Sequence, residues 1–271
     1  MKFSFSSSQI QTYNQCPWKY YLTYKARIAW PKPVSQLFRE FEAETTLGEE
    51  FHRAVHRILQ GITIPVINDD ENPQLIQWLD NFRALDPASG AKQVFSEYEL
   101  SAVVDGSLWS GKFDCIALYE HAIVIFDWKT SSRPLQRKRL LQAAQTRLYP
   151  FLMAENLDRF AGQDQFEVSA IKMVYWNPNF PESKVSLSYD TAQYQADRIF
   201  LNLFAEKLMQ QSEHAFLKTD DLKICQYCKF QTRCLRGMLD EAYDASEIDW
   251  ENLPEMGEDT LTVEDAEFFS K

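Results

Sequence analysis

The chain contains the segment DGSLWSGKFDCIALYEHAIVIFDWK at residues 105–129. The Asp-Gly pair at 105–106 is a strong signal for a two-residue hairpin turn, and a weaker turn signal follows at 120–121. The flanking runs are rich in β-branched and aromatic residues, which favours strands. Together these features predict three successive antiparallel strands, over residues 94–104, 108–118 and 122–128.

The two turns set a register that aligns three acidic residues. Glu97 lies opposite Asp114, and Asp114 lies opposite Asp127. Directly opposed side chains have Cβ atoms about 4.5–5.5 Å apart, and like charges there repel. Residues 123–126 are all apolar, which predicts a strand buried on both faces. Because buried charges need compensation, the row of carboxylates predicts a bound cation.

Lys129 follows Asp127 by two residues, so both side chains project from the same face of the strand. Carboxylate oxygens suit Mg²⁺ or Mn²⁺. A lysine beside a metal-bound water can orient it, and phosphodiester hydrolysis needs such a cation and an activated water. The competing interpretation is a surface salt bridge between Asp127 and Lys129. The buried strand and the opposed Asp114 favour the site.

Three motifs resemble the PD-(D/E)xK nucleases, and most closely the RecB-like branch. They are GKFD at 111–114, DWKT at 127–130 and Q-x3-Y at 145–149. The resemblance implies an α/β, restriction-endonuclease-like core in which helices flank a mixed central sheet. It also implies that Asp114, Asp127 and the carbonyl of Trp128 bind the metal ion.

The same resemblance assigns the remaining catalytic residues. It implies that Lys129 is the catalytic lysine, and that Gln145 and Tyr149, which share one helix face, face the DNA and that lysine. His52 resembles the upstream histidine of the branch, which is a further metal ligand. His56 lies four residues later, so half of a zinc site is the alternative for this pair.

Glu97 is a weaker candidate ligand, because the strand register supports it while the resemblance does not require it.

The cysteines form a second motif. Cys225-x2-Cys228-x5-Cys234 is a strong pattern for thiolate metal binding, and Cys16 and Cys115 are candidates for the fourth ligand. Cys115 follows a site residue directly, so it faces away from the site and is expected in the core.

Cys16 resembles the first ligand of the iron–sulfur RecB-like nucleases, which include the AddB nuclease domain and the CRISPR-associated members. The resemblance implies a structural 4Fe–4S cluster held by Cys16, Cys225, Cys228 and Cys234, which joins the two ends of the nuclease fold. From spacing alone zinc is an equal candidate.

Periodicity and end signals predict the other elements. Helices are expected over 8–25, interrupted or kinked at Pro17, and over 36–60, 73–85, 134–156 and 190–212. Strands are expected over 166–176 and 184–189, and a loop over 62–72.

The charge is unevenly distributed. The 271 residues include 39 acidic and 28 basic side chains, but 12 of the acidic ones and one basic one lie from Asp240 onward. The sequence therefore predicts a charge-balanced nuclease domain at 1–239. It also predicts a mobile acidic tail at 240–271, which could bind a protein partner or mimic DNA. Only 8 glycines are present, which disfavours glycine-rich phosphate loops.

No apolar run is long enough for a membrane span, and the N-terminus lacks a signal-peptide pattern. A cytoplasmic protein without membrane contact is expected.

DNA is the expected partner. Lys112 and a run of basic residues without acidic neighbours are the predicted phosphate contacts; the run comprises Arg133, Arg137, Lys138, Arg139 and Arg147. With no base-reading motif, binding is expected to be independent of sequence. We therefore expect an exonuclease on DNA ends or single strands, in DNA repair or recombination or in CRISPR adaptation. The alternative is a non-catalytic DNA-binding or assembly subunit in which an iron–sulfur cluster or zinc ion has a structural role.

Overall fold

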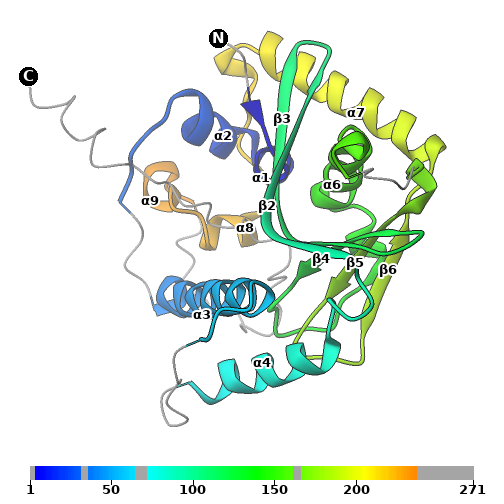
Figure 1. Ribbon diagram of the computed structural model, residues 1–271. Coiled ribbons are helices and arrows are strands. Elements are labelled where there is room, and N and C mark those ends of the chain that lie inside the picture. The colour runs from blue at the N-terminus through cyan, green and yellow to red at the C-terminus, as the bar shows by residue number, and fades with distance from the viewer. Residues whose placement is uncertain (1–3, 32–35, 65–71, 161–165, 237–271) are drawn as a thin grey trace, which may run out of the picture.

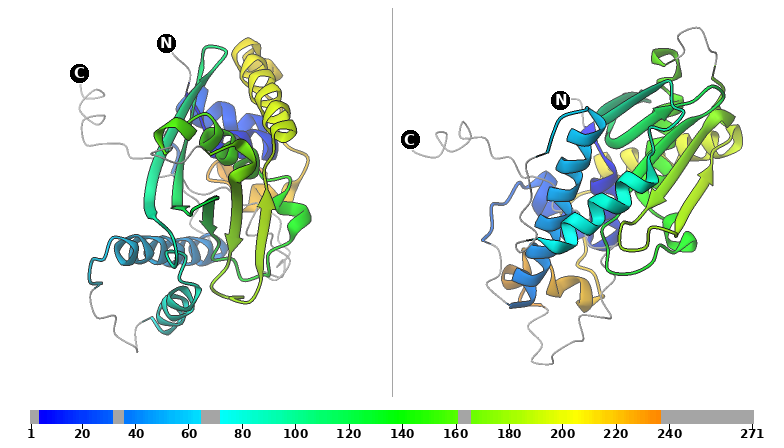
Figure 2. Two further views of the ribbon diagram at one scale, coloured as in Figure 1. Left: turned by 45° about the vertical axis from the view of Figure 1, so that its right-hand side comes forward. Right: turned by 60° about the horizontal axis from the view of Figure 1, so that its bottom comes forward.

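The computed structural model describes residues 4–31, 36–64, 72–160 and 166–236. One mixed sheet lies at its centre, with helices on both faces (Figures 1 and 2). This agrees with the predicted restriction-endonuclease-like architecture. Within the described part of the chain, every helix is too short or too polar to cross a bilayer.

The sheet is built around a long hairpin. Its strands are β1 (Ser4–Phe5), β2 (Gln93–Val104), β3 (Ser107–Leu118), β4 (Ile123–Trp128), β5 (Ile171–Trp176) and β6 (Lys184–Ser188). Strand β3 pairs with β2 along its length, and its other edge is shared by β1 and β4. β4 and β5 run parallel, and β6 closes the far edge antiparallel to β5.

Helices cover the two faces and pack two separate cores. They are α1 (Ser7–Gln15), α2 (Pro17–Tyr20), the π-helical turn η1 (Tyr21–Lys25), α3 (Gln36–Leu59), α4 (Pro73–Leu85), α5 (Arg137–Leu140), α6 (Ala144–Ala154), α7 (Thr191–Gln210), α8 (Leu222–Gln226) and α9 (Gln231–Cys234), with 3-10 turns at Leu157–Arg159, Val168–Ala170 and Glu213–Ala215. The larger core lies between one face of the sheet and α1, α6 and α7. The second core joins α3 and α4 to the opposite face.

Both predicted hairpin registers are confirmed. Val104 pairs with Ser107 across the first turn. At the second turn the N–H of Tyr119 donates to the carbonyl of Ala122, 2.8 Å away. The β2–β3 ladder skips one position, opposite Asp114, where Glu97 has a φ of 53°. The hairpin is sharply bent in Figure 1, and this left-handed residue gives β2 a place to change direction.

Two N-terminal details differ in their outcome. The predicted kink at Pro17 is confirmed, because this proline begins α2. The first helix begins earlier than the predicted start at Ser8. Ser6 is its N-cap, and the side chain of Ser6 accepts a hydrogen bond from the N–H of Gln9 at 3.4 Å.

The single helix predicted over 134–156 is wrong. The structure contains α5 and α6, separated at Ala143, whose backbone is extended. The carbonyl of Leu140 accepts hydrogen bonds from the Ala143 N–H and from the Thr146 hydroxyl. These bonds end the first helix and turn the chain so that α6 crosses the sheet. The strand expected from residue 166 also begins later, at Ile171, after a 3-10 turn.

Gly111 allows α6 to pack closely on β3. A Cβ atom at this position would lie 2.9 Å from Cε1 of Tyr149 and 3.1 Å from Cδ1 of Leu152. Both residues belong to α6 and are buried. The glycine of the GKFD motif is therefore a packing requirement.

We predict that Gly111→Ala destabilises the protein by about 1–3 kcal/mol, because α6 must move to admit the methyl group. Urea unfolding measures the loss. Ser110→Ala on the same strand is the control and should change stability by less than about 0.5 kcal/mol. Equal stabilities for the two variants would contradict the close approach.

Candidate active site

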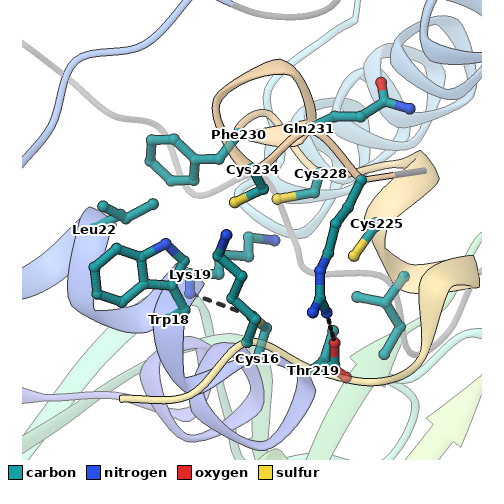
Figure 3. Close-up of a pocket in the computed structure, with 13 residues that line it drawn as sticks. Cys16, Trp18, Lys19, Leu22, Thr219, Cys225, Cys228, Phe230, Gln231 and Cys234 are labelled. Carbon is teal, nitrogen blue, oxygen red and sulfur yellow. Dashed lines mark hydrogen bonds between the residues drawn. The ribbon is translucent and has the colours of Figure 1, made fainter. Parts of the chain in front are cut away.

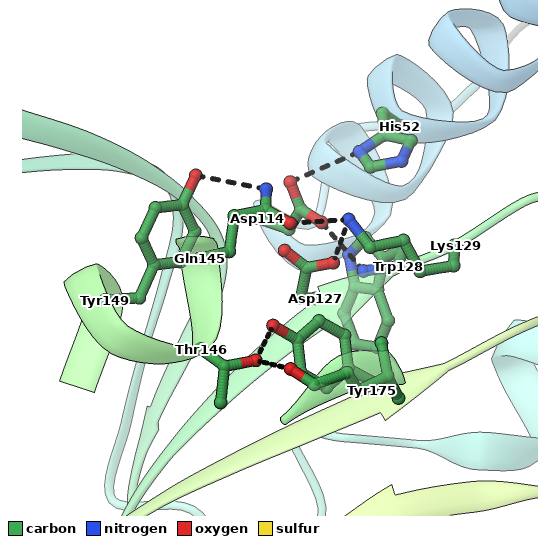
Figure 4. Close-up of polar contacts among 10 residues, drawn as sticks. His52, Asp114, Asp127, Trp128, Lys129, Gln145, Thr146, Tyr149 and Tyr175 are labelled. Atoms are coloured by element: carbon green, nitrogen blue, oxygen red, sulfur yellow. Dashed lines mark hydrogen bonds and ion pairs between the residues drawn. The ribbon is translucent and has the colours of Figure 1, made fainter. Parts of the chain in front are cut away.

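His52 and Asp114 form the first half of the candidate active site. His52 projects from α3, and its Nδ1 lies 3.3 Å from Oδ1 of Asp114 on β3 (Figure 4). Burial alone lowers the pKa of His52, but the charge and hydrogen bond of Asp114 outweigh it and raise the pKa to about 9. The second oxygen of Asp114 accepts a hydrogen bond from the N–H of Trp128 at 2.8 Å. The pair is therefore held between α3 and the end of β4.

The second half is centred on Lys129. Its Nζ lies 2.7 Å from Oδ1 of Asp127, which is 2% exposed. The same Nζ donates to Oε1 of Gln145 at 2.8 Å. The amide of Gln145 in turn lies 3.5 Å from the hydroxyl of Tyr149, one turn further along α6. The structure thus brings together the lysine, the carboxylate and both helix residues that the sequence motifs singled out.

Glu97 joins the His52 side of the site. One ligand atom each from His52, Glu97 and Asp114 lies within 4.8 Å of the other two, a spacing that could hold a metal ion. Lys112 forms an ion pair with Glu97. Asp127 is outside that group and lies on the lysine side. The Trp128 carbonyl stays a prediction as a ligand.

His56 does not share the site. Its Nδ1 lies 2.7 Å from the hydroxyl oxygen of Ser96 on β2, so the structure gives the half-zinc alternative no support.

Two residues in the site were missed from the sequence. Tyr175 lies beside Asp127 in the parallel ladder of β4 and β5, and Lys129 Nζ lies 5.8 Å from the centre of its ring. Its hydroxyl is 2.7 Å from that of Thr146, the neighbour of Gln145 on α6. Tyr175 thus ties β5 to the helix that carries the glutamine. The only sequence signal for Tyr175 was its aromatic side chain within the strand predicted over 166–176.

A second close approach joins α3 to the segment after Lys129. A Cβ atom at Gly48 would lie 2.7 Å from Oγ1 of Thr130. Gly48 precedes His52 by one helical turn, so this contact fixes how near the histidine comes to β4.

The four predicted cysteines line one pocket (Figure 3). Cys16 comes from the start of α2, and Cys225, Cys228 and Cys234 come from the α8–α9 segment. Among the described residues, however, no three cysteine sulfurs lie within 4.8 Å of one another. Cys115 is fully buried in the second core, as expected.

Cations and N–H groups surround these sulfurs. The backbone N–H of Lys19 lies 3.4 Å from the sulfur of Cys16. Burial raises the pKa of Cys228, whereas the charge of Lys19 opposes that shift. Burial likewise raises the pKa of Cys225 to about 11, with Arg236 opposing it. The net shift of both pKa values is upward, so these thiols hold their protons at neutral pH, and a metal would have to displace them to bind.

The predicted DNA contacts have different surroundings. Lys112 is 58% exposed. Arg137 donates to the carbonyl of Ser186 at 2.7 Å, and Arg147 lies 3.4 Å from the buried carboxylate of Asp197. Arg133, Lys138 and Arg139 lie in the same stretch of chain, between β4 and α6. DNA contact by these side chains stays a prediction.

The predicted tail from Asp240 lies outside the described residues, and its role as a partner-binding segment also stays a prediction.

Comparison with known families identifies the fold. The sequence model described as "PD-(D/E)XK nuclease superfamily" matches residues 4–235. The chain belongs to this superfamily, and membership supports nuclease activity in general. The match spans the site described above and the cysteine segment.

Two solved structures are similar in fold. SSO0001 shares 14% sequence identity over 88% of this chain and 89% of its own, with a TM-score of 0.43. A candidate exonuclease from Eubacterium rectale shares 10% over 90% of this chain and 91% of its own, with a TM-score of 0.47. No curated protein matches the chain.

We predict that Asp114→Asn lowers the pKa of His52 from about 9. The variant keeps an oxygen for the Trp128 N–H but removes the charge that stabilises the imidazolium. While Asp114 is ionised, the pair stabilises the metal-free protein fully below pH 6.5, the ordinary histidine value. This contribution is lost as pH rises through about 9, and also when Asp114 is protonated at acid pH.

NMR titration of the histidine ring protons in chelator-treated protein measures the shift. Glu99→Gln, which neutralises an exposed carboxylate on β2, is the control and should leave His52 unchanged. An unaltered His52 titration in Asp114→Asn would contradict the pairing.

Proposed function

We propose that the chain is a metal-dependent deoxyribonuclease that hydrolyses phosphodiester bonds. The observation that carries the proposal is the fixed geometry around Lys129, whose ammonium lies within 2.8 Å of both a buried carboxylate and Gln145. A surface salt bridge would not need a buried carboxylate and a further hydrogen bond to Gln145 on a neighbouring helix. The arrangement therefore favours a lysine positioned for chemistry.

The donor set fits a hard divalent cation. Asp114 and Asp127, with His52 and Glu97, would hold Mg²⁺ or Mn²⁺, which suits carboxylate oxygens and accepts an imidazole. When bound, the ion supplies charge stabilisation for the phosphoryl oxygens. Lys129 then orients the attacking water, while Gln145 holds the ammonium on the side of α6.

The substrate that we propose is DNA, bound without sequence preference and degraded from ends or single strands. Lys112, whose side chain is exposed and whose ammonium pairs with Glu97, lies on the strand that carries Asp114. The basic residues at 133–139 follow the strand that carries Asp127. Both groups follow or share the strands that carry the carboxylates, and basic side chains there would bind the phosphate backbone. The alternative is a non-catalytic DNA-binding subunit with the same fold.

We predict that three substitutions separate ligands from the catalytic group. Asp114→Ala and Asp127→Ala should abolish cleavage and weaken Mn²⁺ binding. Lys129→Ala should lower the cleavage rate by about 100-fold or more and leave Mn²⁺ and DNA binding intact, because the lysine acts on the water. End-labelled linear DNA and covalently closed circles, with calorimetry for Mn²⁺, provide the readouts.

Asp158→Ala and Lys184→Ala, at exposed positions, are matched controls that should cleave like the wild type. Melting curves exclude unfolded variants. Cleavage by Lys129→Ala at the wild-type rate would overturn the mechanism. DNA binding without cleavage in the wild type would favour the non-catalytic alternative, and cleavage of closed circles would contradict an exonuclease.

We further propose that the cysteine pocket holds a structural 4Fe–4S cluster. Tetrahedral zinc, with bonds of about 2.3 Å, would bring its sulfur ligands to about 3.8 Å from one another. Among the described residues no three cysteine sulfurs lie within 4.8 Å of one another, so the four thiols are not already at zinc spacing. The split arrangement, with one cysteine before the nuclease core and three after it, is what supports the cluster. Lys19, Lys218 and Arg236 line the pocket and would offset the negative charge of bound thiolates.

We predict that protein purified without oxygen is brown and contains about four iron and four sulfide ions per chain. Cys228→Ser should lose the colour and most of the iron. Cys115→Ser, which alters a buried cysteine outside the pocket, should retain both. Stoichiometric zinc without iron or sulfide would contradict the cluster.

A further inference from the structure

We propose that Asn177 is a positioning residue for the active site. It holds the segment that follows Lys129 and thereby fixes where the lysine side chain starts. The proposal rests on the proposed nuclease function, in which Lys129 is catalytic. Asn177 follows β5 directly and is fully buried.

The side chain of Asn177 is engaged at both ends. Its Nδ2 donates to the carbonyl and hydroxyl oxygens of Ser131, at 2.8 and 3.0 Å, and to the carbonyl of Arg133 at 3.3 Å. Its Oδ1 accepts from the N–H of Asn179 at 2.8 Å. A buried amide with all of these partners specifies one backbone path for residues 131–133.

Asn179 extends the same set of contacts toward Lys129. Its Nδ2 donates to the carbonyls of Thr130 and Ser131, at 3.3 and 3.0 Å. The N–H of Lys129 itself donates to the carbonyl of Trp176 at 2.8 Å. The main chain is therefore held at 129, 130, 131 and 133, by the end of β5 and by the side chains of Asn177 and Asn179, although no helix or strand includes these residues.

Helix α4 donates two side-chain hydrogen bonds to this turn. Trp78 Nε1 donates to Oδ1 of Asn179, and Nδ2 of Asn81 donates to the carbonyl of Pro178, both at 2.8 Å. On the other side Thr130 lies against Gly48 of α3. The segment after Lys129 is thus held between the turn at 176–179 and the helix that carries His52.

Such a support matters for Lys129 because its side chain is long. The position of the ammonium depends on the backbone at 129–131, and a misplacement of about 1 Å can cost about 100-fold in rate. Asp114 and Asp127 belong to β3 and β4, before the supported segment. Loss of Asn177 should therefore impair the chemical step and leave the metal ligands in place.

A purely structural role would look different, and Asn156 provides the comparison. Asn156 is 6% exposed, and its Nδ2 donates to the carbonyls of Ser101 and Leu152 at 3.1 and 2.7 Å. It is likewise a buried asparagine that binds main-chain carbonyls, but its partners belong to β2 and α6, outside the lysine segment. Its loss should cost stability alone.

The test compares Asn177→Ala with Asn156→Ala, at a temperature at which both are folded. We expect kcat on end-labelled DNA to fall by about 10- to 100-fold in Asn177→Ala, with KM and Mn²⁺ affinity within about twofold of wild type. Asn156→Ala should keep kcat within about twofold. A kcat in Asn177→Ala equal to that of Asn156→Ala would overturn the proposal. If Asn177→Ala does not fold, Asn179→Ala is used with the same expectation and the same overturning result.

Hydrogen exchange gives a readout that does not depend on activity. Peptides that cover 129–136 should lose protection in Asn177→Ala and keep it in Asn156→Ala; unchanged protection in both would overturn the proposal. If the wild type does not cleave DNA but this exchange difference is found, the nuclease function fails while the support of the segment stands.

Discussion

Two carboxylates on adjacent strands, one buried and one half-buried, each paired with a cationic side chain, constrain the rest of this structure. Like charges about 4 Å apart repel by about 4 kcal/mol near a protein surface, and more where water is excluded. Asp114 is compensated by His52 and by a backbone N–H, and Asp127 is compensated by Lys129. Each cation must come from a different element, so α3 and the end of β4 have to meet at the same place on the sheet.

That requirement explains the close contacts of α3 and α6. Gly48 lets α3 reach Thr130, and Gly111 lets the ring of Tyr149 lie against β3. Behind the site strand, Phe82 of α4 packs edge-on against Trp128 at a centroid distance of 5.3 Å. The segment over 73–85, which no motif accounted for, therefore backs the strand that carries Asp127 and Lys129.

The sequence predicted the parts of the site that local turn chemistry determines. A two-residue turn fixes a register across a whole hairpin, so the opposition of Glu97 and Asp114 followed from residues 105–106. The left-handed backbone of Glu97 did not follow, because it arises from the bend of the hairpin and not from a local preference for this conformation. The prediction of one long helix over 134–156 was wrong for a similar reason.

That helix was predicted from its flanking signals and composition. These do not reveal the local hydrogen bond from the Thr146 hydroxyl to the Leu140 carbonyl at the break between α5 and α6. The roles of the asparagines at 177 and 179 could not be predicted from the sequence either, since their amide nitrogens donate mainly to main-chain carbonyls. Any residue presents such a carbonyl, so the partner sequence carries no signal. Residues whose side chains bind the main chain of irregular segments are thus the part of the site that the sequence does not predict.

Around the cysteine pocket, hydrogen bonds between protein groups also join the two ends of the described fold. The N–H of Trp18 donates to the carbonyl of Leu217 at 3.0 Å, and Trp30 Nε1 donates to Thr232 at 2.9 Å. These bonds bring Cys16 to the α8–α9 segment before any ligand bond forms. Because burial raises the thiol pKa values there, a metal must displace protons as it binds. The stabilisation that such a group adds therefore weakens as pH falls, whereas the hydrogen bonds between the two ends do not titrate.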